Sequence, residues 1–165
     1  MGTLTLELTW QDIKFQNQTA SEWLLHYHQR RQQYYQMLNN FSELAATQYT
    51  GMPHGSGPGN PTMQKAVDLG KLKEYESWIM TIEGVERIIS PKKAVFLEVR
   101  REAELIKNDG EVGRPNWAGY VQVNYADKIN RLYNYNHVPS ERTMRSWWNE
   151  MTDLAIRIAI KRGCL

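Results

Sequence analysis

One stretch of the sequence, TGMPHGSGPGNP at residues 50–61, limits what this chain can fold into. Its twelve residues include four glycines and three prolines. Neither a helix nor a strand sustains that composition, because glycine costs conformational entropy and proline lacks a backbone N–H. The segment has neither the GxxxxGK[ST] nor the GxGxxG pattern of a phosphate-binding loop. We therefore expect a flexible linker at residues 51–61, between an N-terminal part of residues 1–50 and a domain of residues 62–165.

Ahead of this linker the sequence predicts a helical arm. Residues 3–10, TLTLELTW, alternate polar and apolar side chains in the period of a short strand or an extended tail. Thr19 can cap a helix, and Glu22 three residues later completes a capping box. A single long amphipathic helix follows. Its apolar side consists of Trp23, Leu24, Tyr27, Tyr34, Tyr35, Leu38, Phe41 and Ala45.

Two more helices are predicted after the linker. The first runs from Thr62 to about Ile89, with a seam spaced by three and four residues. This seam consists of Leu72, Tyr75, Ile79, Ile82 and Ile89. It could pair with the N-terminal helix or with a second chain, and we predict a homodimer from it and from the aromatic stripe of the first helix. Ser90 and Pro91 form a cap and a first helical position, so another helix runs from Pro91 to about Lys107.

The last third of the chain contains a clear signal for the start of a helix. Residues 108–123 combine turn residues with an extended-looking segment, AGYVQV. Asn124 can cap a short helix that ends near Tyr133, and residues 134–139 form a connector of turn formers. Ser140 follows a proline and precedes Glu141, whose charge suits the positive end of a helix dipole. A helix therefore begins at Ser140, and we expect an all-α fold.

This last helix has two different sides. The apolar side consists of Met144, Trp147, Trp148, Met151, Leu154, Ala155 and Ile158. The outward side of the first turns carries Arg142, Arg145, Ser146 and Asn149. A guanidinium matches guanine O6 and N7, and an amide matches adenine N6 and N7. A solvated helix face has the same composition, so spacing alone leaves both interpretations open. Further along, Ile156 and Ile160 return to the outward side, so we expect the second half to pack against another element.

Charge is distributed unevenly along the chain. The formal net charge is +2. Residues 1–111 contain 12 Lys and Arg against 14 Asp and Glu, whereas residues 112–165 contain 8 against 4. The excess of positive charge therefore lies in the part that holds the last helix. Such an asymmetry is compatible with a polyanionic partner and also with an ordinary solvated surface.

Two stretches resemble a known family. PSERTMRSWWNEMTDLAIRIAIKRG at residues 139–163, with the preceding NYADKINRL, resembles the C-terminal module of the RinA/ArpU group of phage transcriptional regulators. GNPTMQKAVDL at residues 59–69 is similar to the segment after the glycine-rich loop of that group. The resemblance implies a sigma factor region 4-like helix-turn-helix at about residues 124–163. It also implies activation of late genes in phages or prophages of Gram-positive bacteria.

The chain departs from the family pattern in two places. The helix before the turn has Tyr125, Ile129 and Asn130 where the group commonly has a Trp-x-x-Ile-Ala core, and the loop at residues 108–120 is longer. Both departures concern the start of the first motif helix rather than the recognition helix.

We expect a set of contacts to double-stranded DNA from this resemblance and from the polar face. Arg142, Arg145, Ser146 and Asn149 are expected at bases or nearby phosphates, with Ser140, Glu141 and Thr143 at the helix start beside the DNA backbone. Lys128 and Arg131 are expected to assist from the preceding helix. Two alternatives stay open: a DNA-packaging adaptor of the small terminase type, and a module that binds RNA polymerase through Trp147 and the Ile156 face.

Other functions have little support in the sequence. No two of the four histidines, His26, His28, His54 and His137, have the i, i+4 spacing of a helical metal site, and Cys164 is the single cysteine. Neither a GxSxG nor a Cys-His arrangement of a nucleophile occurs. No apolar run approaches the ~20 residues of a membrane span, and no signal peptide opens the chain. We expect a cytoplasmic protein that is not an enzyme and needs no cofactor or metal.

Overall fold

The computed structural model describes residues 8–47, 61–108 and 117–165. In these ranges all the regular secondary structure is α-helical, which confirms the all-α prediction. The helices are α1 (Trp10–Leu25), α2 (Tyr27–Thr47), α3 (Pro61–Ile88), α4 (Pro91–Asn108), α5 (Trp117–Tyr133) and α6 (Glu141–Arg162). No helix in these ranges is long and apolar enough to cross a membrane.

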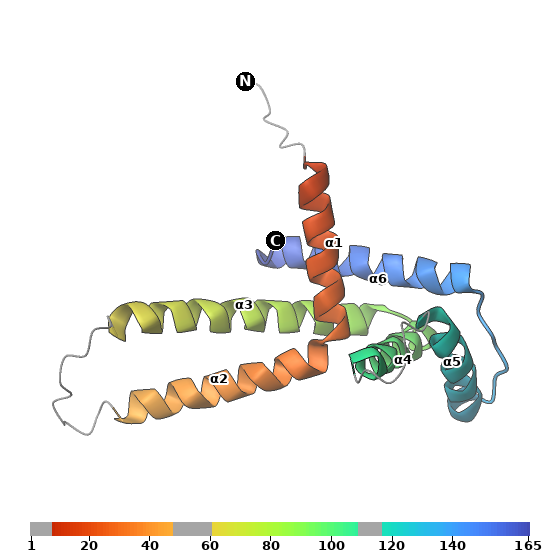
Figure 1. Ribbon diagram of the computed structural model, residues 1–165, viewed down its shortest axis with the longest axis horizontal. Helices are drawn as coiled ribbons and strands as arrows, with labels where there is room; N and C mark the ends of the chain where they lie inside the picture. Colours follow the sequence, from red (N-terminus) through yellow and green to blue (C-terminus); the bar gives the residue numbers. More distant parts are fainter. Residues whose placement is uncertain (1–7, 48–60, 109–116) are drawn as a thin grey trace.

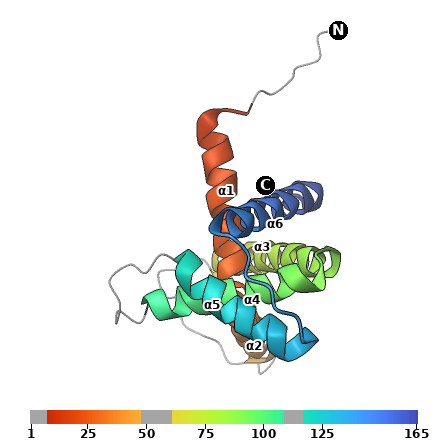
Figure 2. The ribbon, with the colours of Figure 1, turned by 90° about the vertical axis from the view of Figure 1, so that its right-hand side faces the viewer.

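Helices α1, α2 and α6 pack on α3. Helix α2 runs beside α3 as a long hairpin, α6 lies along the C-terminal half of α3, and α5 packs chiefly on α4 (Figure 1). Helix α1 crosses α3 and α6, and its N-terminal half projects beyond them (Figure 2). The predicted linker lies at residues that are almost all outside the described ranges, and α3 begins at its last residue, Pro61.

A single hydrophobic core connects the N-terminal helices to the rest of the chain. Trp23 of α1 stacks on Trp78 of α3 with a centroid distance of 5.6 Å, and Tyr75 meets Trp23 edge-on at 5.0 Å. The core continues through Ile82 of α3 and Phe96 of α4, and includes buried side chains of α5 and α6. Helix α1 is therefore part of the same packed unit as α3 to α6.

The seam of α3 is buried within the chain itself. Leu72, Ile79 and Ile82 are buried, and Tyr75 and Ile89 are partly buried against the same core. The partners of this seam are the neighbouring helices of its own chain. Of the two pairings that the sequence allowed, the structure shows the intramolecular one, so the seam no longer motivates a dimer.

The start of the first helix differs from the sequence prediction. Trp10 begins α1, so the last residue of the segment 3–10, predicted as a short strand or an extended tail, is helical; residues 1–7 lie outside the described part of the chain. Thr9 is the N-cap and Asp12 completes its capping box, whereas Thr19 lies inside α1. Thr9 and Asp12 have the spacing of a capping box, and the period-two pattern hid this local signal.

The predicted single N-terminal helix is two helices. α1 ends at Leu25, and α2 begins at Tyr27 after a change of direction at His26. Arg101 of α4 is buried at this break, and its Nε donates to the carbonyl oxygen of Leu24 at 2.8 Å. A guanidinium from a distant helix thus hydrogen-bonds the main chain where the helix changes direction. Nothing local in the sequence signals this break.

Helix α5 also begins earlier than predicted. It starts at Trp117, so the segment AGYVQV is helical rather than extended. Asn124 does not cap the helix; its amide Nδ2 donates to the carbonyl oxygen of Tyr120 within it. The buried side is spaced by three and four residues and packs mainly on α4: Ala118, Val121, Tyr125 and Ile129. Burial of this side outweighs the β propensity of the valines.

Candidate nucleic-acid interface

The last helix begins where the sequence predicted. Ser140 is the N-cap in extended conformation, and its Oγ accepts a hydrogen bond from the backbone N–H of Thr143 at 3.1 Å. At the other end Gly163 adopts a left-handed φ of 74°, a conformation that suits a residue without Cβ. Local residues therefore fix both ends of α6, the Ser140 side chain at the start and the left-handed backbone of Gly163 at the end.

The connector before α6 is held against α5. Gln122 donates from Nε2 to the carbonyl oxygen of Pro139 at 2.8 Å, and Pro139 is buried. His137 packs edge-on to Tyr125 with 6.2 Å between ring centroids. Seven residues, 134–140, separate the two helices, more than the three or four of a compact helix-turn-helix. The connector thus sets the position of the first turn of α6.

The two adjacent tryptophans anchor α6 to the helices beneath it. The Trp147 ring meets Phe96 of α4 at 5.6 Å and Tyr125 of α5 at 5.7 Å. Trp148 lies near the guanidinium of Arg100, with 5.3 Å from Cζ to the ring centroid. Burial of this guanidinium lowers the pKa of Arg100. Both tryptophans are partly buried against the core, so they orient the helix and leave its opposite side to solvent.

The predicted polar face is exposed and forms one surface. Arg142, Arg145, Ser146 and Asn149 are all exposed, and they line an open hollow of about 560 Å³. The hollow also contains three carboxylates. The sequence-based prediction of base contacts did not consider that these carboxylates could form ion pairs with the arginines. The carboxylates belong to Glu141, Glu150 and Asp153. For Asp153 the available signal was its helical spacing from Arg142, since eleven residues correspond to about 20° of rotation and place both on one side of the helix.

Ion pairs neutralise part of this surface. Arg145 pairs with Glu141, with 2.6 Å between Nη2 and Oε1. Glu150 accepts a hydrogen bond from Lys93 of α4, which lowers the pKa of the Glu150 carboxyl. Arg142 has no ion-pair partner among the described residues. It is thus the guanidinium of this hollow with the greatest freedom to bind a partner.

Two of the expected DNA contacts lie elsewhere. Lys128 of α5 pairs with Glu102 at 2.6 Å and with Glu98 at 3.4 Å, and the hydrogen bond to Glu102 raises the Lys128 pKa. Arg131 is exposed and pairs with Asp127 at 2.9 Å within α5. Neither side chain lines the α6 hollow. Because Lys128 is held between two carboxylates of α4, we do not include it in the interface.

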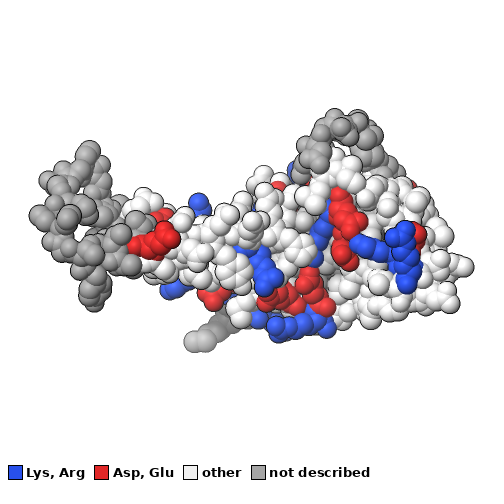
Figure 3. Space-filling model, turned by 90° about the horizontal axis from the view of Figure 1, so that it is seen from below, with Lys and Arg blue, Asp and Glu red and all other residues white. Residues whose placement is uncertain are grey.

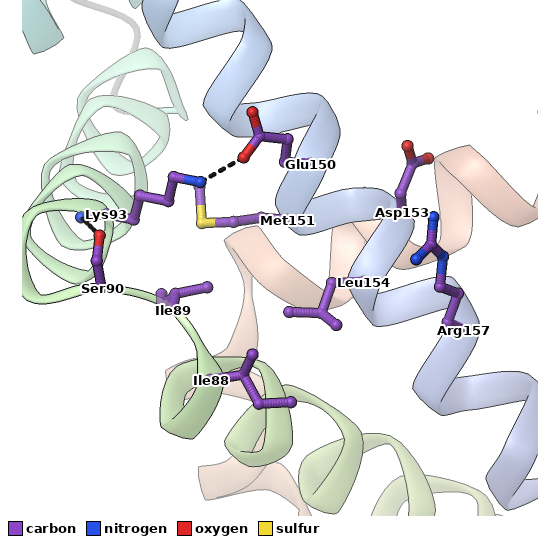
Figure 4. A pocket seen from close by; sticks show the side chains of 9 residues that line it. All are labelled: Ile88, Ile89, Ser90, Lys93, Glu150, Met151, Asp153, Leu154 and Arg157. Carbon is purple, nitrogen blue, oxygen red and sulfur yellow. Dashed lines mark hydrogen bonds and ion pairs between the residues drawn. The ribbon is translucent and has the colours of Figure 1, made fainter.

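A second cavity adjoins the hollow and was not foreseen. It measures about 360 Å³ and lies between α6 and the junction of α3 and α4 (Figure 4). Ile88, Ile89, Met151 and Leu154 give it apolar walls, while charged side chains stand at its edge. Those charged residues are Lys93, Glu150, Asp153 and Arg157. The apolar residues come from helices far apart in sequence, so no local pattern marks this cavity.

The remaining outward residues of α6 only partly follow the prediction. Ile156 is partly buried and packs against the core, whereas Ile160 remains 49% exposed. Helix α1 contacts α6. The expectation that this half packs on another element is therefore confirmed for Ile156 and wrong for Ile160.

Charge elsewhere on the surface is mixed. Figure 3, seen from below, shows acidic and basic side chains interspersed rather than gathered in one basic patch. Some of the charged side chains are paired, including Arg30 with Glu22. In the described ranges no group of three or more His, Cys, Asp or Glu side chains is placed to hold a metal ion.

Comparison with known proteins gives no relative: no protein-family model, no curated protein and no solved structure matches this chain.

Proposed function

We propose that the protein is a sequence-specific DNA-binding regulator and that the N-terminal half of α6 enters the major groove. The observation that carries the proposal is the exposed face of Arg142, Arg145, Ser146 and Asn149, which begins at a capped helix N-terminus. A recognition helix inserts this part of its length into DNA. The resemblance of this stretch to the RinA/ArpU group extends the proposal to activation of phage or prophage late genes, with α5 as the preceding helix of a helix-turn-helix.

Each side chain has a role that follows from its chemistry. Arg142 has five N–H donors and can form two hydrogen bonds to guanine O6 and N7. Asn149 can pair with adenine N6 and N7, and Ser146 can donate to either purine or pyrimidine edges. Ser140 and Thr143 stand at the positive end of the helix dipole, where a phosphate oxygen is favourably placed.

We expect the affinity for DNA to depend only modestly on salt concentration. The carboxylates of Glu141, Glu150 and Asp153 share the hollow, so the net attraction for phosphates is small. If two or three phosphates are neutralised, the slope of log K against log salt is about −2 to −3. Specific contacts to bases must then supply most of the selectivity, and one copy of the module binds weakly at physiological salt.

Selection from a random 20-bp duplex library followed by fluorescence anisotropy tests this proposal. The expected result is an enriched sequence that the wild-type protein binds and that Arg142→Ala binds about 5- to 150-fold more weakly, the range of about 1–3 kcal/mol for a lost bidentate contact. Arg87→Ala is the matched control, because Arg87 is an exposed arginine of α3 outside the hollow. No enriched sequence, or equal binding by Arg142→Ala, would overturn the proposal.

A second candidate is a module that binds another protein, for example RNA polymerase. The cavity of Ile88 and Leu154, with its apolar walls and charged edge, favours it, because protein interfaces combine an apolar centre with a polar rim. Trp147 is packed against Phe96 and Tyr125, so it is a poor anchor for such a partner. Loss of binding to purified bacterial RNA polymerase by Ile88→Glu, with DNA binding unchanged, would favour this function over DNA readout.

A further inference from the structure

Arg145 is the more restrained of the two arginines that line the α6 hollow. Its Nε and Nη2 both donate to Oε1 of Glu141, at 2.9 and 2.6 Å. Its Cζ also lies over the Trp117 ring of α5, 5.4 Å from the ring centroid. Two side chains from two different helices therefore hold the Arg145 guanidinium in place.

The Trp117 ring is itself fixed by the core beneath it. It meets Phe96 of α4 edge-on, with 6.4 Å between the ring centroids. The buried guanidinium of Arg100 lies over the same ring, 4.7 Å from its centroid. A guanidinium over an indole face is attracted by the negative charge of the π-system. The ion pair with Glu141 alone would let the Arg145 group turn about one oxygen atom, and contact with the fixed ring restricts that rotation.

The contacts of Arg145 leave one edge of its guanidinium open. Arginine has five N–H donors in a planar fork. Glu141 occupies the edge formed by Nε and Nη2, and among the described residues Nη1 makes no hydrogen bond. The Arg145 side chain is 52% exposed and lines the hollow. The free edge, formed by Nη1 and the second N–H of Nη2, can therefore donate two parallel hydrogen bonds to one ligand.

The neighbouring carboxylate decides which ligand suits this edge. A phosphate oxygen at Arg145 would also lie near the charge of Glu141 and be repelled by it. Guanine is neutral, and its O6 and N7 atoms accept a bidentate pair of hydrogen bonds from a guanidinium. Arg145 also lies in the first two turns of α6, the part of a recognition helix whose side chains contact base edges. Guanine therefore fits the site better than a phosphate does.

We propose that Glu141 and Trp117 are positioning residues that hold Arg145 for the recognition of one guanine in the major groove. The inference rests on the proposed DNA binding and adds to it a second base-reading arginine, whose orientation is set before DNA binds. Immobilising a long side chain on binding lowers affinity. Because Arg145 is already held, it loses less conformational entropy on contact with the base than an unrestrained arginine does. Arg145 then contributes specificity, and Glu141 supports DNA binding although its charge is negative.

The sign of the Glu141→Ala effect tests this role. Electrostatics alone predicts tighter DNA binding, because the substitution removes a negative charge from the DNA-facing surface. Positioning predicts the opposite: on the duplex enriched by selection, fluorescence anisotropy should show binding weakened about 2- to 12-fold, the range for immobilising one long side chain. Asp153→Ala is the matched control, since Asp153 lines the same hollow and forms no ion pair among the described residues. This control should bind equally or more tightly than wild type.

A second background separates positioning from a change in helix stability. In Arg145→Ala protein the arginine to be positioned is absent, so Glu141→Ala should then leave DNA binding equal or tighter. Loss of a favourable charge at the start of α6 would instead weaken binding in both backgrounds. Trp117→Leu removes the ring without a change in charge and should weaken binding by a similar factor, with the helix content verified by circular dichroism. Unchanged binding by Trp117→Leu would contradict the role of the ring.

Replacement of single guanines by 7-deazaguanine identifies the base. This analogue lacks the N7 acceptor that a bidentate contact requires. At the position whose guanine preference disappears when the selection is repeated with Arg145→Ala, the analogue should weaken wild-type binding. It should have no further effect on Arg145→Ala, and a smaller effect on Glu141→Ala and Trp117→Leu than on wild type.

The outcomes separate this inference from the proposed function. If selection enriches no sequence, DNA readout fails and the inference fails with it. If a sequence is enriched and its binding depends on Arg142, but Glu141→Ala changes affinity in the same direction in both backgrounds, the positioning role alone is overturned. If Arg145→Ala weakens binding to all duplexes alike, with no change in base preference, Arg145 contacts a phosphate and the assignment to guanine is wrong.

Discussion

Removal of the buried guanidinium of Arg101 should destabilise the junction of three helices. Its Nε donates to the carbonyl oxygen of Leu24 at 2.8 Å, where α1 gives way to α2. Its Nη1 pairs with the Glu86 carboxylate of α3 at 2.7 Å, and its Cζ lies 5.1 Å from the centroid of the Tyr27 ring. Arg101 and its hydrogen bond to Leu24 are buried, so truncation leaves the Leu24 carbonyl oxygen without a substitute from water.

The magnitude follows from these contacts. A hydrogen bond to a charged group contributes about 1.5–3 kcal/mol, and this one is buried. The pair with Glu86 adds no more than about 1 kcal/mol, because the Glu86 side chain is 34% exposed and water screens its charge. Arg101→Ala is thus expected to cost about 3 kcal/mol of unfolding free energy. Arg101→Lys retains a charge that can reach one acceptor but not both, so about half of this loss is expected.

Urea denaturation followed by circular dichroism at 222 nm provides the measurement. Arg87→Ala serves as the control, because that exposed arginine of α3 should change stability by less than about 0.5 kcal/mol. If Arg101→Ala costs less than about 1 kcal/mol, the hydrogen bond to Leu24 does not support the break as argued. If Arg101→Lys and Arg101→Ala lower the unfolding free energy equally, the simultaneous contact of the guanidinium with Leu24 and Glu86 does not have the role assigned to it.

Three further substitutions test local features of the fold. Ser140→Ala should cost about 1 kcal/mol of unfolding free energy, because the Thr143 N–H loses its cap; a negligible loss in urea titration would contradict this. Gly163→Ala should cost about 1–2 kcal/mol, since φ is 74°, and an unchanged thermal midpoint would count against it. Burial and a hydrogen bond to Glu83 raise the Tyr27 pKa to about 12. Wild type should therefore lose up to about 1.4 kcal/mol per unit between pH 10 and 12, relative to Tyr27→Phe. Parallel pH profiles would refute this last prediction.

The sign of the pH effect follows from linkage. An unfolded tyrosine ionises near pH 10, whereas Tyr27 in the folded protein stays neutral to higher pH. The stabilisation is fully present below pH 10 and is lost as the pH rises through the folded pKa.

The sequence by itself determined the helical class and several helix ends. Ser140 and the Ser90–Pro91 pair act on backbone groups within their own first turn, so a few adjacent residues suffice to place α6 and α4. The apolar side of α6 was predictable for the same reason, since a fixed rotation per residue assigns each side chain to a face. The exposure of Arg142 and Asn149 followed from that assignment.

Only the tertiary structure decided which elements meet and which charges pair. Arg101 reaches Leu24 across 77 positions, and Lys93 reaches Glu150 across 57, distances over which no spacing rule operates. Packing on α4 made residues 117–123 helical against their β propensity. Lys128 and Arg142 are both basic residues in candidate motif helices, yet packing places only Lys128 between two carboxylates. Local hydrogen bonds and helix geometry depend on neighbours in sequence, whereas burial and ion pairing depend on neighbours in space.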